Sequence, residues 1–468
     1  MCTVIRGNID QRGNIFKLAI IAFVYRVADT KPDTFSKALL CSRRLEPLSS
    51  GAHPEMNQLA ALYPSFNQTT RIILATFKWI GLIPFDVECI SLKLQLRSVQ
   101  QIQFSYKWIL MTVAFFPAKV VIVAIFHQQV FFTYYAVGLI NDMLKYIGGM
   151  VAIYITLVEV FAQRKDHVHM YERLTSTDLN KLVFKLRQGK EHRKCLKRFN
   201  FKFFALLATI LIIELRIFLK IITYSKQWRN VWVTNFPMLS FLRLRVLYYI
   251  FTVDILQAQL TSVRVQILKV CETMKLVKMW HPNSKQYRQT VDKVCNSLIY
   301  LKQCYTDIWL CHFHHNQTTG WSICFIMVSY FVQFSSDLYW LYLTVNEKAT
   351  DGYGEIILCL CPAPLLICAI LYSTERCMEV SRQVGTLLHE IPKHSEKNLY
   401  HIIYRFSSHI SYQPIRFVAH SLFDVNYKLI KMLLTAVVTY MFIFIPFGWD
   451  APKVKDFITT TPESHFPK

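Results

Sequence analysis

The sequence predicts an all-α membrane protein with seven transmembrane helices, an amino terminus in the cytosol and a carboxyl terminus outside the cell. Composition is the first reason, because 53% of the 468 residues are hydrophobic and only 18% are charged, against about 25% charged in soluble domains. Length is the second. Seven apolar runs reach the roughly 20 residues that a helix needs to cross about 30 Å of hydrocarbon.

The seven runs follow one another without overlap. Their approximate ranges are 108–127, 134–161, 201–224, 238–260, 321–345, 354–373 and 427–448. The sixth run contains Pro362 and Pro364, which predict a bend because proline removes a backbone hydrogen-bond donor. The chain is therefore divided into a cytosolic region 1–105, a helical membrane domain 106–448 and a short extracellular tail 449–468.

The distribution of lysine and arginine predicts the orientation. Linkers 164–200, 263–317 and 374–425 hold eleven, eight and six of them, whereas the alternate linkers hold none, two and one. Basic residues are enriched in cytosolic loops, so the amino terminus is predicted to be cytosolic. This opposes a G-protein-coupled receptor, which needs the reverse topology. The net charge of +23 lies in clusters between apolar runs, which indicates membrane lipid as a partner and no nucleic acid.

Ionisable side chains inside the apolar runs indicate a ligand pocket in the predicted outer half of the helices. Such groups are costly in lipid and face a partner or a water-filled cavity. The pocket candidates are Lys119, Asp142, Lys145, Glu214, Arg216, Arg243 and Asp337. Alternatively, Lys220, Arg243 and Arg245 extend to the membrane interface while the other charges form structural pairs. Asp254 lies deeper and has no evident partner in the sequence.

No catalytic constellation, nucleotide-binding glycine loop or zinc-like ligand spacing stands out in the sequence. The sequence therefore predicts no enzyme activity, no cofactor and no metal site. The thirteen cysteines form no CxxC pair, which favours reduced thiols. There is also no visible internal repeat of the kind that many secondary transporters carry.

The seventh run differs from the others because no charged side chain lies between Met432 and Trp449. It contains Thr439 and Tyr440, then five apolar residues, then Pro446 and Phe447. This order resembles the TYhhhhhQF signature of the insect gustatory receptor family, in which h is any hydrophobic residue.

Two further segments are similar to elements of the same family. "AHSLFDVNYKLIKMLL" (419–434) resembles the Ala-x-Gly-Leu-Phe lead-in to the last helix, and "WIGLIPFDV" (79–87) resembles an LGLxPF element before the first span. The resemblance covers most of residues 70–448. The chain departs from the family pattern at Pro446, where the signature has glutamine, and at Ser421, where the lead-in has glycine.

The resemblance implies a chemosensory channel in the plasma membrane of a sensory neuron. Members of the family are tetrameric ligand-gated cation channels that bind a tastant in an outer-half pocket and line the pore with the seventh helix. Carried over by position, the pore or gate residues are Thr439, Tyr440, Met441, Phe442, Ile443, Phe444, Ile445, Pro446 and Phe447. Tyr440 is expected to link the pocket side to the pore helix, and the apolar residues are expected to close the gate by dewetting.

Several alternatives stay open at this stage. The chain is otherwise an odorant-receptor-type subunit that needs a co-receptor, a metabotropic seven-helix receptor, or a transporter. The residues of the last run otherwise pack against lipid or neighbouring helices. The ligand class is also open, because mixed charge suits polar tastants whereas the many aromatic residues suit bitter alkaloids or hydrocarbons.

Overall fold

The computed structural model describes residues 136–174, 190–223, 226–277, 284–346, 353–392 and 396–446, with short stretches outside these ranges. The predicted first span (108–127), with Lys119, lies outside the described residues. So do Phe447, the predicted extracellular tail and most of the region 1–105.

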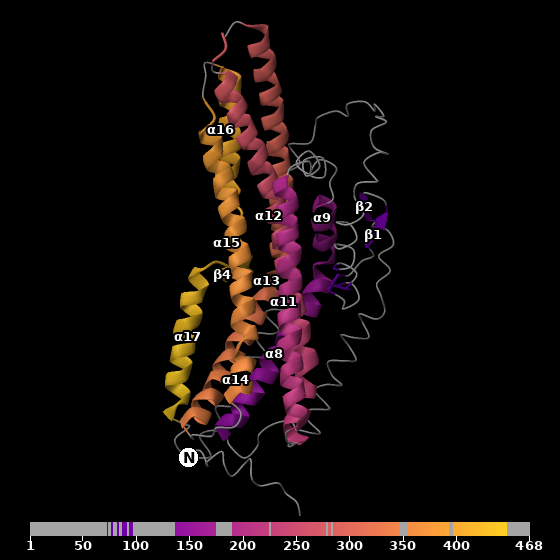
Figure 1. The fold of residues 1–468 in the computed structure, drawn as a ribbon, viewed down its shortest axis with the longest axis vertical. Coiled ribbons are helices and arrows are strands. Elements are labelled where there is room, and N and C mark those ends of the chain that lie inside the picture. Colours follow the sequence, from indigo (N-terminus) through magenta and orange to yellow (C-terminus); the bar gives the residue numbers. More distant parts are fainter. Residues whose placement is uncertain are drawn as a thin grey trace, which may run out of the picture. The chain divides into compact units, whose positions relative to one another are not determined.

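Helices make up most of the described chain, and each of the other six predicted spans falls in them (Figure 1). They are α8 (Ala136–Ala162), α9 (Arg164–Leu174), α11 (Lys190–Thr223), α12 (Lys226–Val277), α13 (Lys285–Asn346), α14 (Tyr353–Leu360), α15 (Pro362–His389), α16 (Lys397–Tyr412) and α17 (Lys428–Phe444). Among the described residues, three helical stretches are long and apolar enough to cross a membrane: Gly138–Ala162, Lys285–Val345 and Ile356–His389.

The cytosolic linker predicted at 263–317 is mostly helical, because α12 and α13 continue far beyond their apolar runs. Its apolar residues recur every three or four positions, so one face of each helix is buried. The buried residues of the α12 extension are Val263, Ile267, Val270, Cys271, Met274 and Val277. This stretch is amphipathic rather than apolar throughout, which is why hydropathy alone assigns it to a linker.

The bend predicted in the sixth span is a break between two helices. α14 ends at Leu360 and α15 begins at Pro362. Proline is well suited to the first position of a helix, because the N–H that it lacks would have no partner there. α17 ends at Phe444, before Pro446, so this proline ends the seventh helix and does not kink it.

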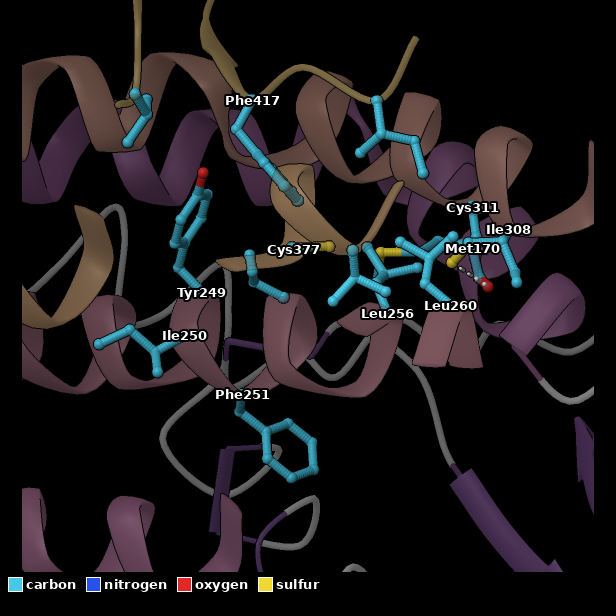
Figure 2. Close-up of a cluster of buried hydrophobic side chains, with 14 of the residues drawn as sticks. Met170, Tyr249, Ile250, Phe251, Leu256, Leu260, Ile308, Cys311, Cys377 and Phe417 are labelled. Atoms are coloured by element: carbon cyan, nitrogen blue, oxygen red, sulfur yellow. Dashed lines mark hydrogen bonds between the residues drawn. The ribbon is translucent and has the colours of Figure 1, made fainter. Parts of the chain in front are cut away.

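The core forms where α12 packs on α15, α13 and α11, and where α13 packs on α8 and α9. Figure 2 shows part of it, with Tyr249 entering from α12, Cys377 from α15 and Phe417 from the linker between α16 and α17. The rings of Tyr249 and Phe417 lie 6.4 Å apart at 70°. The linker is therefore held by the same core as the long helices.

The α16–α17 linker contains a small hairpin of β3 (Val418–Ala419) and β4 (Phe423–Asp424). Its turn places two non-glycine residues at positive φ, His420 at 44° and Ser421 at 61°, and the Leu422 N–H donates to the Ala419 carbonyl at 3.0 Å. Positive φ at both central residues defines a type I′ turn, which favours glycine. Ser421 therefore stands at a position where glycine would be free of backbone strain.

A second antiparallel hairpin, β1 (Val87–Ile90) and β2 (Lys93–Leu96), precedes the helices. Just before it, Phe77, Leu82 and Ile83 are buried. Phe77 packs edge-on against Tyr248 of α12, with ring centroids 5.2 Å apart. Part of the LGLxPF-like segment thus belongs to the core of the helical domain.

Candidate functional site

Two ion pairs, one partly buried and one buried, bring four of the predicted pocket residues together. Lys145 of α8 donates to Asp337 of α13, and Arg243 of α12 donates to Glu214 of α11. The Arg243 and Glu214 side chains are only 5% and 8% exposed. Both Arg243 and Lys145 interact electrostatically with Asp337, and Lys145 also interacts with Asp142. We call these five residues the outer charged cluster, after the extracellular half of the helices in which the sequence predicts them: Asp142, Lys145, Glu214, Arg243 and Asp337.

The structure separates Arg216 from this cluster. Arg216 is exposed although it lies only two residues after the buried Glu214. Residues two apart point to different sides of an α-helix, so both cannot face the same interior. The extension of Arg243 and Arg245 to the membrane interface is a wrong expectation, because both side chains are buried.

Tyr440 joins the last helix to the outer charged cluster. Its hydroxyl donates to Oδ1 of Asn141, a fully buried residue next to Asp142 on α8, and its phenol lies within electrostatic reach of Lys145. The Tyr440 ring stacks on Phe444 with centroids 4.2 Å apart and meets Phe331 of α13 edge-on at 6.2 Å. Tyr440 thus connects the last helix, of which it is part, to the stretch of α8 that carries Asp142 and Lys145.

The signature residues divide between two faces of α17, the yellow helix of Figure 1. The packed face holds Val437, Tyr440 and Phe444, spaced as one side of a helix. The opposite face is exposed in the single chain and includes Lys431, Thr435, Val438, Thr439, Phe442 and Ile443; Pro446, just after the helix, is exposed too. Phe442 is 75% exposed. Residues of one continuous signature, such as Tyr440 and Phe442, therefore have different surroundings.

A further ion pair, between Arg245 of α12 and Glu159 of α8, is buried. Glu159 was not among the pocket residues predicted from the sequence. Arg245 of α12 lies 3.2 Å from Glu159 of α8, and their side chains are 0% and 2% exposed. Glu159 is the only acid in the run "YITLVEVF" of the second predicted span, and a lone acid in such a run was the available signal. The pair binds directly to the backbone of α13 through the Trp321 and Ser322 amides.

Asp254 also has a partner, which the sequence did not reveal. Lys202 of α11 donates to both of its carboxylate oxygens, at 3.1 and 3.0 Å. Lys202 also donates to Ser373 of α15 and lies 5.6 Å from the centroid of the Tyr372 ring. This set ties three helices together at a buried position.

His167 of α9 lies near the Glu159–Arg245 pair and is buried. Burial, with a smaller effect of the Arg245 charge, lowers the pKa of His167 well below its ordinary value. Its Nδ1 lies 3.4 Å from the Tyr248 hydroxyl. The ring is therefore neutral near pH 7. In the described part of the chain, no three His, Cys, Asp or Glu side chains are placed to hold a metal ion.

Three described helical stretches that are long and apolar enough to cross a membrane, with buried charges that pair across helices, are typical of a polytopic helical membrane protein. The family model described as 7tm Chemosensory receptor matches residues 70–448, and the chain belongs to that family. The resemblance to insect chemoreceptors is thus confirmed.

One insect receptor is similar to the chain in sequence, and another is similar in fold. Gustatory receptor 23a of Drosophila melanogaster is 25% identical over 211 residues, which is 44% of this chain and 56% of that receptor. The insect olfactory receptor OR5 from Machilis hrabei has a similar fold, with a TM-score of 0.56 and 11% identity over 81% of this chain and 97% of that one. Its complex with eugenol gives a TM-score of 0.50 at 10% identity, over 82% and 100%. At these identities the solved structures show the fold alone.

Proposed function

We propose that this chain is a subunit of a gustatory-type chemoreceptor, a ligand-gated cation channel in the plasma membrane of a chemosensory neuron. The observation that carries the proposal is the hydrogen bond from Tyr440 to Asn141, because it joins the signature helix to the outer charged cluster. A ligand that alters this cluster changes the packing of α17 with no intervening element. The cluster lies in the half of the helices that the basic linkers predict to be extracellular.

The exposed face of α17 is suited to line a pore shared with other subunits. Phe442 and Ile443 are large apolar side chains on this face, and a ring of such groups excludes water and blocks ions until it widens. The exposed face also carries Thr435 and Thr439, whose hydroxyls suit a hydrated path. A tetramer, of identical or different subunits, would surround this path with four copies of the helix.

The outer charged cluster favours a small ligand that carries polar groups. Four of its five members form two ion pairs, Lys145 with Asp337 and Arg243 with Glu214, so a ligand with both donors and acceptors can replace these contacts without leaving a bare charge. The eugenol-bound relative shows that a receptor of this fold binds a small molecule with a phenolic hydroxyl. We therefore place neutral or zwitterionic tastants ahead of purely hydrocarbon ligands.

The gustatory branch is supported by the Thr439–Tyr440 pair of the signature and by the relationship to Gustatory receptor 23a. An odorant-receptor-type subunit is the second candidate, since the fold is shared with an olfactory receptor. The two differ in whether the chain conducts without a co-receptor.

Patch-clamp recording of the chain expressed alone tests the proposal. We expect ligand-dependent cation currents for at least one compound in a panel of sugars, amino acids, bitter compounds and hydrocarbons. Currents that appear only with a co-receptor would favour the odorant-type subunit. Saturable substrate flux without unitary currents, or responses that need a G protein, would contradict the channel.

A further inference from the structure

Side chains of two other helices bind backbone groups in the middle of α13. The Trp321 N–H donates to Oε1 of Glu159 at 2.7 Å and the Ser322 N–H donates to Oε2 at 3.0 Å. Nη2 of Arg245 donates to the Thr318 carbonyl at 2.7 Å. A regular helix uses these N–H and carbonyl groups for its own i to i+4 bonds. α13 is therefore fixed here by partners outside its own backbone.

Burial makes this arrangement sensitive to the Glu159 charge. The carboxylate accepts the two backbone N–H groups and faces Arg245 at 3.2 Å, with almost no exposure to water. Hydrogen bonds to a buried charged group are stronger than neutral ones, and losing one partner leaves the others unsatisfied. Glutamine has the same shape but only one acceptor oxygen, so it cannot replace all three contacts.

The same part of α13 holds the linker that leads to α17. Nε2 of His312 lies 2.8 Å from the Arg416 carbonyl, and Nδ2 of Asn316 donates to that carbonyl at 2.8 Å. The Trp321 ring stacks on His420 with centroids 3.9 Å apart. A Cβ added at Gly320 would lie 3.0 Å from the His420 backbone nitrogen. We call these four α13 residues the linker seat: His312, Asn316, Gly320 and Trp321.

α13 also contacts α17 itself, on the other side of the Glu159–Arg245 pair. Phe331 packs against Tyr440, and Tyr339 packs against Phe444 at 6.2 Å. α13 is thus in contact with the last helix at one end of the stretch and with its linker at the other. The Glu159 and Arg245 contacts at residues 318–322 overlap the end of α13 that holds the linker, and they precede the α17 contacts at Phe331 and Tyr339.

We propose that Glu159 and Arg245 are positioning residues for the last helix, because they fix α13 at residues 318–322 and thereby hold the linker seat against the α16–α17 linker. They act through α13 and touch neither α17 nor the outer charged cluster in the contacts described above. The geometric part of this proposal does not depend on the channel function. Its electrical consequence rests on the proposed function.

Hydrogen exchange on the full chain in lipid nanodiscs tests the geometric part. In Glu159→Gln, we expect the amides of residues 317–325 and of the linker 413–427 to exchange about tenfold faster, as for loss of one charged hydrogen bond. The rest of α13 should keep its protection. Equal exchange in Glu159→Gln and the wild type would overturn the proposal, and so would a uniform loss of protection over the whole chain. Glu375→Gln is the matched control, since it breaks a more exposed ion pair with Arg382 on α15.

Gly320→Ala provides a second variant that leaves both charges in place. The new methyl group would press on the His420 backbone, while alanine favours the helix more than glycine does. We expect faster exchange in the linker and unchanged or slower exchange in α13 at residues 317–325. An unchanged linker would contradict the role of the seat even if Glu159→Gln behaves as expected.

Recording currents separates this proposal from the proposed function. If the chain conducts, Glu159→Gln and Gly320→Ala should both alter the fraction of current that flows without ligand, and Glu375→Gln should not. If the wild type conducts under no condition, the channel proposal fails while the exchange results still decide the positioning role. If the variants show the expected changes in hydrogen exchange but their ligand-free current is unaltered, the link from the linker to the gate is refuted.

Discussion

Loss of Glu214 while Arg243 stays in place should destabilise the fold far more than loss of both. The two side chains are 5% and 8% exposed, so Glu214→Gln leaves a guanidinium with little access to water. Breaking a buried pair in this way costs about 3–5 kcal/mol. We expect a value near the lower end, because Arg243 keeps its interaction with Asp337. Glu214→Leu combined with Arg243→Met should cost much less, since apolar residues of similar volume replace such pairs at little cost.

The assay is thermal unfolding of the detergent-solubilised protein, followed by fluorescence-detected size exclusion. Glu375→Gln again serves as the control, because its pair with Arg382 is largely exposed and contributes about 1 kcal/mol or less. A fall in the midpoint for Glu214→Gln no larger than that for Glu375→Gln would contradict this cost. So would a double variant that loses as much stability as Glu214→Leu and Arg243→Met lose together as separate single variants.

Three further predictions concern single positions. Ser421→Gly should stabilise the fold by about 0.5–1 kcal/mol, because glycine adopts the φ of 61° without strain, and a higher unfolding midpoint would show it. Tyr440→Phe should keep the ring packing but leave Asn141 without its donor, at a cost of about 1–3 kcal/mol; an unchanged unfolding midpoint and an unchanged ligand response would refute this. The pKa of His167 is lowered by burial and by Arg245, so the unfolded chain binds the proton more readily and stability falls as pH drops below about 6.5. His167→Gln should therefore lose less stability than the wild type on acidification, measured as the change in unfolding midpoint.

The sequence predicted the positions of the helices best where contact with lipid requires a long apolar run. Apolar runs of about 20 residues mark spans because hydrocarbon penalises every exposed polar group. The bend predicted at Pro362 and Pro364 follows from local backbone chemistry, although the structure has a break between α14 and α15 there. The continuation of α12 to Val277 was not predictable by hydropathy, because its burial depends on α15 and α13 rather than on lipid.

The sequence indicated that charged side chains inside the spans would form pairs, but it did not indicate which acid pairs with which base. Lys145 and Asp337 are separated by 192 positions, and Glu159 and Arg245 by 86, so only the packing of the helices decides which charges meet. Arg243 and Arg245 illustrate this, since they are two residues apart and bind acids on different helices. Ser421 is a further case. The sequence showed only a departure from the family pattern there, and the positive φ that disfavours a side chain became visible in the structure.

Cysteine accessibility on α17 tests most directly the central claim that its exposed face lines the ion path. Phe442 lies on the exposed face and Phe444 on the packed face, so the variants Phe442→Cys and Phe444→Cys form a matched pair. A positively charged thiol reagent applied during ligand-evoked current should block Phe442→Cys channels and leave Phe444→Cys and wild-type channels unaffected. Block of Phe444→Cys with no effect on Phe442→Cys would contradict the account.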